Sequence, residues 1–219
     1  MFVLVGVTSC AARSPLVAQL CVNPDAKLAT VLEPLGGNAE CDSAGAVDCD
    51  RLHRALDHLA VVCPAHSPTL LVDAVFAYQR QQPARAQQLL DAVLAQPASH
   101  PDAAVLRARI AIEEGNVSFA RRLLEQQLQL TPDHSGLHET SAAAFYVEGR
   151  MNDAAGALNM AEKLGAPRWR VAYHRGLIEE AAGRFDAALR LYEEALKGHP
   201  GWPVAESRAK ALRARGATP

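Results

Sequence analysis

Residues 183–200 have the sequence GRFDAALRLYEEALKGHP, and this stretch determines the fold that we expect for most of the chain. It consists mainly of alanine, leucine, glutamate and arginine, which favour helices. Gly183 precedes the helix at a point where a left-handed turn is needed, and Pro200 stops the helix near its end. The stretch therefore predicts a helix that follows a glycine turn.

The same features recur earlier in the chain at a constant interval. Gly115, Gly149 and Gly183 are spaced 34 residues apart. Three further columns repeat at this step: Ala86, Ala120, Ala154 and Ala188; Ala74, Ala108, Ala142 and Gly176; Leu90, Leu124, Leu158 and Tyr192. A fixed period of this length is typical of repeat architectures. We therefore divide this part of the chain into four units, residues 67–100, 101–134, 135–168 and 169–202.

Each column has a physical role in a pair of antiparallel helices. The small residues of the Ala108 and Ala120 columns allow the two helices of a pair to approach closely. The Leu124 column supplies a larger apolar side chain that fills the space between them. One pair cannot bury its apolar face alone, so successive pairs are expected to stack on one another.

The period and these residues resemble the tetratricopeptide repeat family. The last unit carries the resemblance most fully, at Gly176, Gly183, Phe185, Ala188, Tyr192, Ala195 and Pro200. The first unit departs from the pattern, because Gln81 replaces the turn glycine and Pro83 follows it. The resemblance covers residues 67–202 and implies an all-α fold, a right-handed α-solenoid of four tandem helix hairpins with capping helices at both ends.

Two flanking segments are candidates for the caps. Residues 50–62 predict a helix with Leu52, Leu56 and Leu59 on one face, which packs on the first repeat. Residues 203–219 predict a capping helix and tail, with a narrow stripe of Ala205, Ala209 and Leu212 that covers the last repeat. A basic helix that binds a membrane surface is the alternative for this second segment.

The amino terminus resembles that of bacterial lipoproteins. A short apolar run leads to Val7-Thr8-Ser9-Cys10, so the resemblance implies that residues 1–9 are a signal peptide remnant and that Cys10 is lipidated. Ala11 then favours an outer-membrane lipoprotein facing the periplasm of the bacterial cell envelope. No basic residue precedes the apolar run. The alternative is an apolar terminus that happens to end in a cysteine, in a cytoplasmic protein.

Residues 10–66 form a tether and capping helix that contain every cysteine of the chain. An even set remains after Cys10, namely Cys21, Cys41, Cys49 and Cys63. Two disulfides with three possible pairings are expected for such a set, which would agree with export to an oxidising compartment. Free thiols and a zinc site are the alternatives, although the close-spaced cysteine pairs typical of zinc sites are missing.

Little in the sequence points to chemistry. The net charge is −2, from 22 basic and 24 acidic residues, which argues against a nucleic-acid partner. His66, His100 and His134 recur at the repeat period in the same turn, too far apart to share one metal ion. We therefore expect no catalytic residue, no metal and no cofactor. An enzyme with its site in the cysteine-containing segment is the alternative, without a base to activate the thiols.

The family resemblance implies that the first helix of each unit lines a concave groove for a protein or peptide partner. Tyrosine and arginine often anchor such interfaces, although a tyrosine can instead pack within its own repeat. The groove residues expected on this basis are Tyr78, Arg109, Ile112, Glu113, Glu139, Tyr146, Arg170, Tyr173 and Leu177. The predicted function is a non-catalytic scaffold, lipid-anchored and supporting pilus, secretion or cell-wall machinery. The alternative is a soluble cytosolic adaptor without lipidation, and the oligomeric state stays open.

Overall fold

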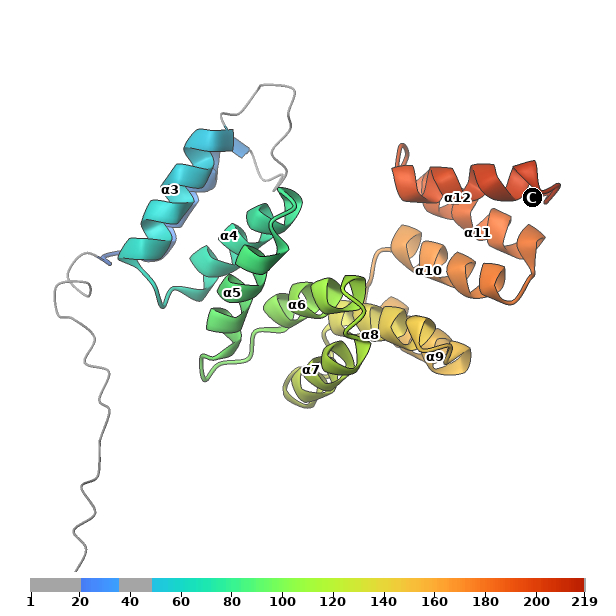
Figure 1. The fold of residues 1–219 in the computed structure, drawn as a ribbon, viewed down its shortest axis with the longest axis horizontal. Coiled ribbons are helices and arrows are strands. Elements are labelled where there is room, and N and C mark those ends of the chain that lie inside the picture. Colours follow the sequence, from blue (N-terminus) through green and yellow to red (C-terminus); the bar gives the residue numbers. More distant parts are fainter. Residues whose placement is uncertain (1–20, 36–48, 219) are drawn as a thin grey trace, which may run out of the picture. The chain divides into compact units, whose positions relative to one another are not determined.

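The computed structural model describes residues 21–35 and 49–218, and every regular element in those two ranges is helical. Contacts divide the chain into two units, residues 1–92 and 93–219. Figure 1 labels the helices of both units. The first unit contains α2 (Pro24–Leu32), the 3-10 helix η1 (Glu33–Leu35), α3 (Cys49–Val62), α4 (Ser67–Gln79) and most of α5 (Pro83–Leu94). The second contains α6 (Pro101–Glu113), α7 (Val117–Leu130), α8 (Ser135–Val147), α9 (Met151–Lys163), α10 (Arg168–Ala181), α11 (Phe185–Gly198) and α12 (Pro203–Ala214). The predicted all-α fold of paired helices is confirmed.

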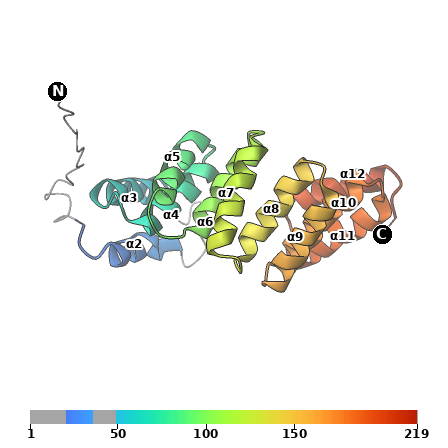
Figure 2. The same ribbon diagram turned by 90° about the horizontal axis from the view of Figure 1, so that it is seen from below.

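The helices of the second unit follow one another in chain order (Figure 2). Within each pair the two helices pack together, as α6 does with α7, α8 with α9 and α10 with α11. The second helix of a pair then packs on the first helix of the next, and the first helices α6, α8 and α10 also adjoin one another. The side of the unit formed by these first helices is therefore continuous.

Glycine makes the sharp turn inside each pair of the second unit. Gly115, Gly149 and Gly183 have φ values of 81°, 75° and 74°, in the left-handed region that favours glycine. Each turn is closed by the same two backbone hydrogen bonds. At the first of them, Gly115 N–H donates to the carbonyl of Ile112 over 3.0 Å, and Asn116 N–H donates to that of Ala111 over 2.7 Å. These bonds satisfy carbonyls that the helix end would otherwise leave unpaired.

The first repeat makes the same turn without glycine. Gln81 adopts a φ of 58°, and Gln82 N–H donates to the carbonyl of Ala77 over 2.9 Å. A side chain in the left-handed region costs about 1–2 kcal/mol, because its Cβ approaches the following carbonyl oxygen. The repeat geometry is therefore maintained here against a local penalty.

Gln81→Gly is expected to stabilise the first unit by up to about 1 kcal/mol, because it removes this penalty at some cost in the entropy of the unfolded chain. Amide hydrogen exchange of α4 and α5 measures the change locally. The matched control is Gly149→Ala, which places a Cβ in the same conformation and should cost about as much as Gln81→Gly gains. Unchanged exchange in α4 and α5 would show that the turn at Gln81 is not strained.

The repeated columns form the core of each helix pair. Ala86, Ala120, Ala154 and Ala188 are fully buried, and so are the larger residues Leu90, Leu124, Leu158 and Tyr192. In the last repeat the pair Gly176 and Tyr192 stands where the other repeats have alanine and leucine. A Cβ on Gly176 would lie 2.5 Å from Tyr192 Cε1, so the larger ring requires the smaller partner.

The repeat pattern extends beyond the four repeats at both ends. Helix α3 begins 34 residues before α5, and Leu56, one step before Leu90, is fully buried against α2 and α4. At the other end Ala205 lies one step after Val171 and is fully buried where α12 packs on α11. Helix α3 thus takes the place of a second helix of an incomplete repeat, and α12 that of a first helix.

Within the first unit, helix α2 is linked to its neighbours by a disulfide and a polar contact. Cys21, just before α2, forms a disulfide with Cys63, just after α3. Asp25 of α2 lies 3.1 Å from Nε2 of His66, the residue that precedes α4. Leu28 of α2 is buried in the apolar cluster of α3 and α4. Helix α2 is therefore packed on α3 and α4.

An arginine links the three helices α3, α4 and α5. Arg85 of α5 pairs with Asp57 of α3, and it also donates to Asp73 Oδ2 of α4 over 3.0 Å. The side chain of Asp73 is fully buried, and this burial raises its pKa above the ordinary value although Arg85 opposes the shift. Arg85 thus compensates a buried carboxylate while it connects neighbouring helices.

Candidate partner-binding groove

A hollow of about 380 Å³ lies on the side of the second unit formed by the first helices. Val105 and Arg109 of α6, Glu139 of α8, Arg170 and Tyr173 of α10, and Trp202 and Val204 at the start of α12 line this central hollow. Four helices that are far apart in sequence therefore contribute to one surface.

An apolar pocket of about 210 Å³ adjoins the central hollow. Ala143 and His174 line both of them, so the two spaces are neighbours. The rest of the lining is almost wholly apolar and comes from Ala142, Tyr146, Val147, Leu158, Leu177 and Ile178. A shallow third hollow, lined by Glu180 and Arg208, meets the central one at Val204. We call the central hollow, the apolar pocket and the shallow hollow together the groove.

The buried carboxylate of Glu139 pairs with two side chains in the floor of the central hollow. Arg170 Nη2 donates to Glu139 Oε2 over 2.6 Å, and His174 Nε2 lies 3.4 Å from Glu139 Oε1. Burial by itself raises the pKa of Glu139, but the hydrogen bond of His174 and the charge of Arg170 hold that pKa below its ordinary value. Arg170 Nε is also buried and has no hydrogen-bond partner within residues 21–35 and 49–218. Glu139 is therefore ionised at neutral pH, and its charge is compensated within the groove.

A second carboxylate links α10, α11 and α12. Tyr192 Oη donates to Glu180 Oε2 over 2.6 Å, and Arg208 Nη1 donates to the same oxygen over 3.1 Å. Burial and the neighbouring Glu180 raise the pKa of Tyr192 far above its ordinary value. Burial raises the pKa of Tyr173 as well. Both tyrosines therefore stay neutral, and they pack in the core of the last repeat.

Aromatic rings form one wall of the central hollow. The ring centroids of Tyr173 and Trp202 lie 4.5 Å apart, and those of Tyr173 and Tyr192 lie 5.6 Å apart. Trp169 meets Trp202 edge to face with its centroid at 4.9 Å. Of these rings Tyr173 and Trp202 line the hollow, and Trp169 and Tyr192 pack against them.

The structure brings most of the predicted groove residues together. Those that line the groove are Arg109, Glu113, Glu139, Tyr146, Arg170, Tyr173 and Leu177. Tyr173 does so as a largely buried ring, because it also packs in the core of the last repeat. Ile112 packs against the core between α6 and α7, and Tyr78 lies in the first unit.

Sequence reasoning missed His174, Trp202 and Val204 as groove residues. Val204 lies one repeat step after Arg170, so continuing the 34-residue column into α12 would have found it. His174 lies one helical turn after Arg170, on the same face of α10. Trp202 carried no such signal, because it stands in the turn between two helices.

Acidification is expected to destabilise the second unit through Glu139. A carboxylate whose folded pKa is depressed contributes stability above its unfolded pKa, and this contribution is lost as the pH falls below about 4.5. Urea unfolding followed by tryptophan fluorescence reports on this unit, because Trp169 and Trp202 both lie in it. Glu139→Gln should lower stability at pH 7 and flatten its decline between pH 6 and about 3. An equally steep decline in the variant would assign the effect to other carboxylates.

The recurring histidines occupy the positions just before first helices. His66, His100 and His134 are the N-cap residues of α4, α6 and α8. The side chain of His134 accepts a hydrogen bond from Leu137 N–H over 3.3 Å. In the part of the chain that the structure describes, no group of three or more histidine, cysteine, aspartate or glutamate residues could hold a metal ion.

The cysteines lie partly within the described residues. Cys21 and Cys63 are bonded to each other, and Cys49 is disulfide-bonded as well. Cys41 and the predicted lipidation site Cys10 lie outside the described residues. Across residues 21–35 and 49–218, no helix combines the length and apolarity that crossing a bilayer requires.

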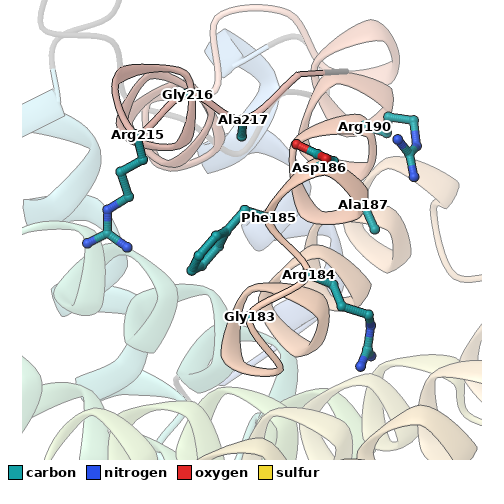
Figure 3. Close-up of a pocket in the computed structure, with 9 residues that line it drawn as sticks. All are labelled: Gly183, Arg184, Phe185, Asp186, Ala187, Arg190, Arg215, Gly216 and Ala217. Atoms are coloured by element: carbon teal, nitrogen blue, oxygen red, sulfur yellow. The ribbon is translucent and has the colours of Figure 1, made fainter.

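A separate hollow lies where α11 begins, beside the end of α12 (Figure 3). Its charged lining includes Arg184, which pairs with Glu179, and Asp186, which accepts a hydrogen bond from Thr218 N–H over 2.9 Å. Arg190 and Arg215 stand on opposite sides with their guanidinium groups pointing apart. Because the cations do not converge, this hollow is not an anion site.

Comparisons with known proteins identify the architecture. Residues 77–143 match the family model of the tetratricopeptide repeat. A thermophilic TPR protein of Thermus thermophilus, TTC0263, is 14% identical with a TM-score of 0.69, over 87% of this chain and 99% of that one. A tetratricopeptide repeat protein of Parabacteroides merdae is 17% identical with a TM-score of 0.66, over 91% and 74%.

A third similar structure is that of YrrB, described as a TPR protein with an unusual peptide-binding site. It is 12% identical with a TM-score of 0.53, over 83% of this chain and 88% of that one. At these identities the likeness concerns the fold alone. No curated protein matches the sequence significantly.

Proposed function

We propose that this chain, whose residues 77–143 match the tetratricopeptide repeat family, is a non-catalytic scaffold whose groove in the second unit binds a segment of another protein. The observation that carries the proposal is the row of three adjoining hollows along α6, α8, α10 and α12. Concave sites with apolar walls and a few placed polar groups are the usual form of binding sites. The peptide-binding site named for YrrB is consistent with this role.

The polar groups in the groove support binding rather than catalysis. Glu139 is held ionised by Arg170 and His174, and Tyr192 is held neutral by burial and Glu180. A general acid or base works best with a pKa near the operating pH, and these shifts move both groups away from it. The groove therefore offers fixed charges and apolar surface for recognition.

Blocking the groove tests this proposal. Ala143 lines both the central hollow and the apolar pocket, so Ala143→Phe is expected to fill that junction and to weaken partner binding at least about tenfold. The measurement is affinity capture from the native host, followed by binding of the purified partner. The control is Ala214→Phe, the same change at an exposed position of α12 that lines none of the hollows of the groove. Equal capture by both variants would refute the assignment.

We further propose that the scaffold is exported and anchored through lipidated Cys10, and serves pilus, secretion or cell-wall machinery on the periplasmic side of the outer membrane. The sequence before Cys10 and the disulfide between Cys21 and Cys63 support export, because disulfides persist in oxidising compartments. Metabolic palmitate labelling of the wild type, lost in Cys10→Ser, is the expected result. Equal labelling, or none in either chain, favours the unlipidated cytosolic adaptor.

A further inference from the structure

We infer that the occupant of the groove is an acidic protein segment in which one large apolar side chain stands two to four residues from an aspartate or glutamate. This inference rests on the proposed function and adds the chemistry of the partner. Two features of the groove carry it, the apolar pocket and the unequal exposure of the paired charges.

The apolar pocket accepts the large side chain. Its lining includes Tyr146, Leu158, Leu177 and Ile178, and it opens into the central hollow beside Ala143 and His174. Leu158 is fully buried at its floor, whereas Tyr146 and Leu177 are partly exposed. Leucine, isoleucine, methionine or phenylalanine in this space would remove these apolar surfaces from water.

The charges that the groove turns toward solvent are mainly positive. The side chains of Glu139 and Glu180 are 10% and 21% exposed, whereas those of their partners Arg170 and Arg208 are 38% and 42% exposed. Each carboxylate is therefore largely buried against its arginine in the floor of the groove, while the arginine remains accessible to solvent. Arg109 and Glu113 also line the central hollow and carry opposite charges, so together they leave this balance unchanged.

Arg170 is the residue best placed to receive a carboxylate of the partner. A guanidinium group has five N–H donors, of which Glu139 engages Nη2. A carboxylate at this point would form a charge-assisted hydrogen bond with the guanidinium group.

The spacing of the two contacts sets the spacing in the partner. Arg170, His174 and Leu177 lie on one face of α10, and the first and last of them are separated by about 10 Å along the helix axis at 1.5 Å per residue. An extended segment covers about 3.3 Å per residue. The acidic residue and the apolar residue therefore fall about three positions apart.

Selection from a random peptide library displayed on phage tests this inference on the full chain. Selected peptides are measured by fluorescence polarisation against the wild type, Ala143→Phe and the double variant Glu139→Gln/Arg170→Gln. The double variant replaces the ion pair by two amides, so it removes the guanidinium without leaving a buried charge unpaired. Tryptophan fluorescence checks that each variant unfolds at the same urea concentration as the wild type.

We expect the selected peptides to combine an apolar residue with an acidic residue at the stated spacing. Changing that aspartate to asparagine should weaken binding to the wild type about tenfold and leave binding to the double variant unaltered. If the selected peptides bind Ala143→Phe more weakly than the wild type but show no preference for an acidic residue, the inference is overturned and the groove remains a binding site. If no peptide binding is sensitive to Ala143→Phe, the proposed function itself is wrong.

Discussion

Tyr192→Leu is expected to destabilise the second unit by about 2–4 kcal/mol, because the smaller side chain leaves a cavity beside Gly176 and removes the hydrogen bond to Glu180. Gly176→Ala is expected to cost about 1–3 kcal/mol, because its Cβ would lie 2.5 Å from a ring that is fully buried. Urea unfolding monitored by the fluorescence of Trp169 and Trp202 measures both.

The double variant Gly176→Ala/Tyr192→Leu distinguishes packing from simple loss of contacts. It recreates the combination found in the other repeats, such as Ala142 with Leu158. The two changes should therefore compensate, with a coupling of about 1–3 kcal/mol in a double-mutant cycle. Additive losses would mean that the two positions are independent, contrary to their close approach.

Replacing both Cys21 and Cys63 by serine is expected to destabilise the first unit by about 2–5 kcal/mol. The bond closes a loop with a sequence separation of 42, and its loss lets the unfolded chain gain entropy. Amide hydrogen exchange in α2 and α3 is the measurement, since the disulfide joins the residues that flank this pair of helices. Protection equal to that of the wild type would show that the non-covalent contacts of α2 suffice to hold it.

A reducing agent provides the control for the cysteine variant. Cys49 is also disulfide-bonded, so reduction of the wild type removes more than the one bond. If reduction affects the wild type strongly and the serine variant little, the bond between Cys21 and Cys63 carries the stabilisation. An equal effect of reduction on both proteins would assign it to the disulfide of Cys49.

The repeat period predicts the fold because the residue type at each repeated position meets a steric requirement that recurs in every helix pair. Gly115, Gly149 and Gly183 stand at left-handed turns, and the alanine and leucine columns are buried as expected. Gln81 shows the limit of reasoning from residue type, since it adopts the same turn without being glycine. There the stacking of the repeat overrides the local preference.

The ends of the array were harder to predict, because incomplete repeats lack most of the columns. Leu56 continues the leucine column into α3, but no glycine or alanine column accompanies it. Helix α12 buries Ala205, Ala209 and Leu212, but the Ala74 column falls on Lys210 there. Its place as a first helix was therefore established by its packing on α11, although the 34-residue step from Arg170 already points to Val204.

The groove was predictable as a face but not as a set of interactions. The helical spacing places Glu139, Tyr146 and Arg170 on the first helices of their repeats. Side chains at these positions are expected on one common face. Their pairing depends on which residues of neighbouring helices meet, and on how deeply each is buried. Glu139 therefore became the buried partner of Arg170, which no pattern within one repeat could specify.

Site-specific photo-crosslinking tests the central claim most directly. A photoreactive phenylalanine analogue replaces Tyr146 or Val204 in the groove, or Met160 or Leu130, which are exposed apolar residues outside it. We predict that the same partner protein is captured from the two groove positions in the native host and not from Met160 or Leu130. Capture of that partner from Met160 or Leu130, with none from Tyr146 and Val204, would contradict the account.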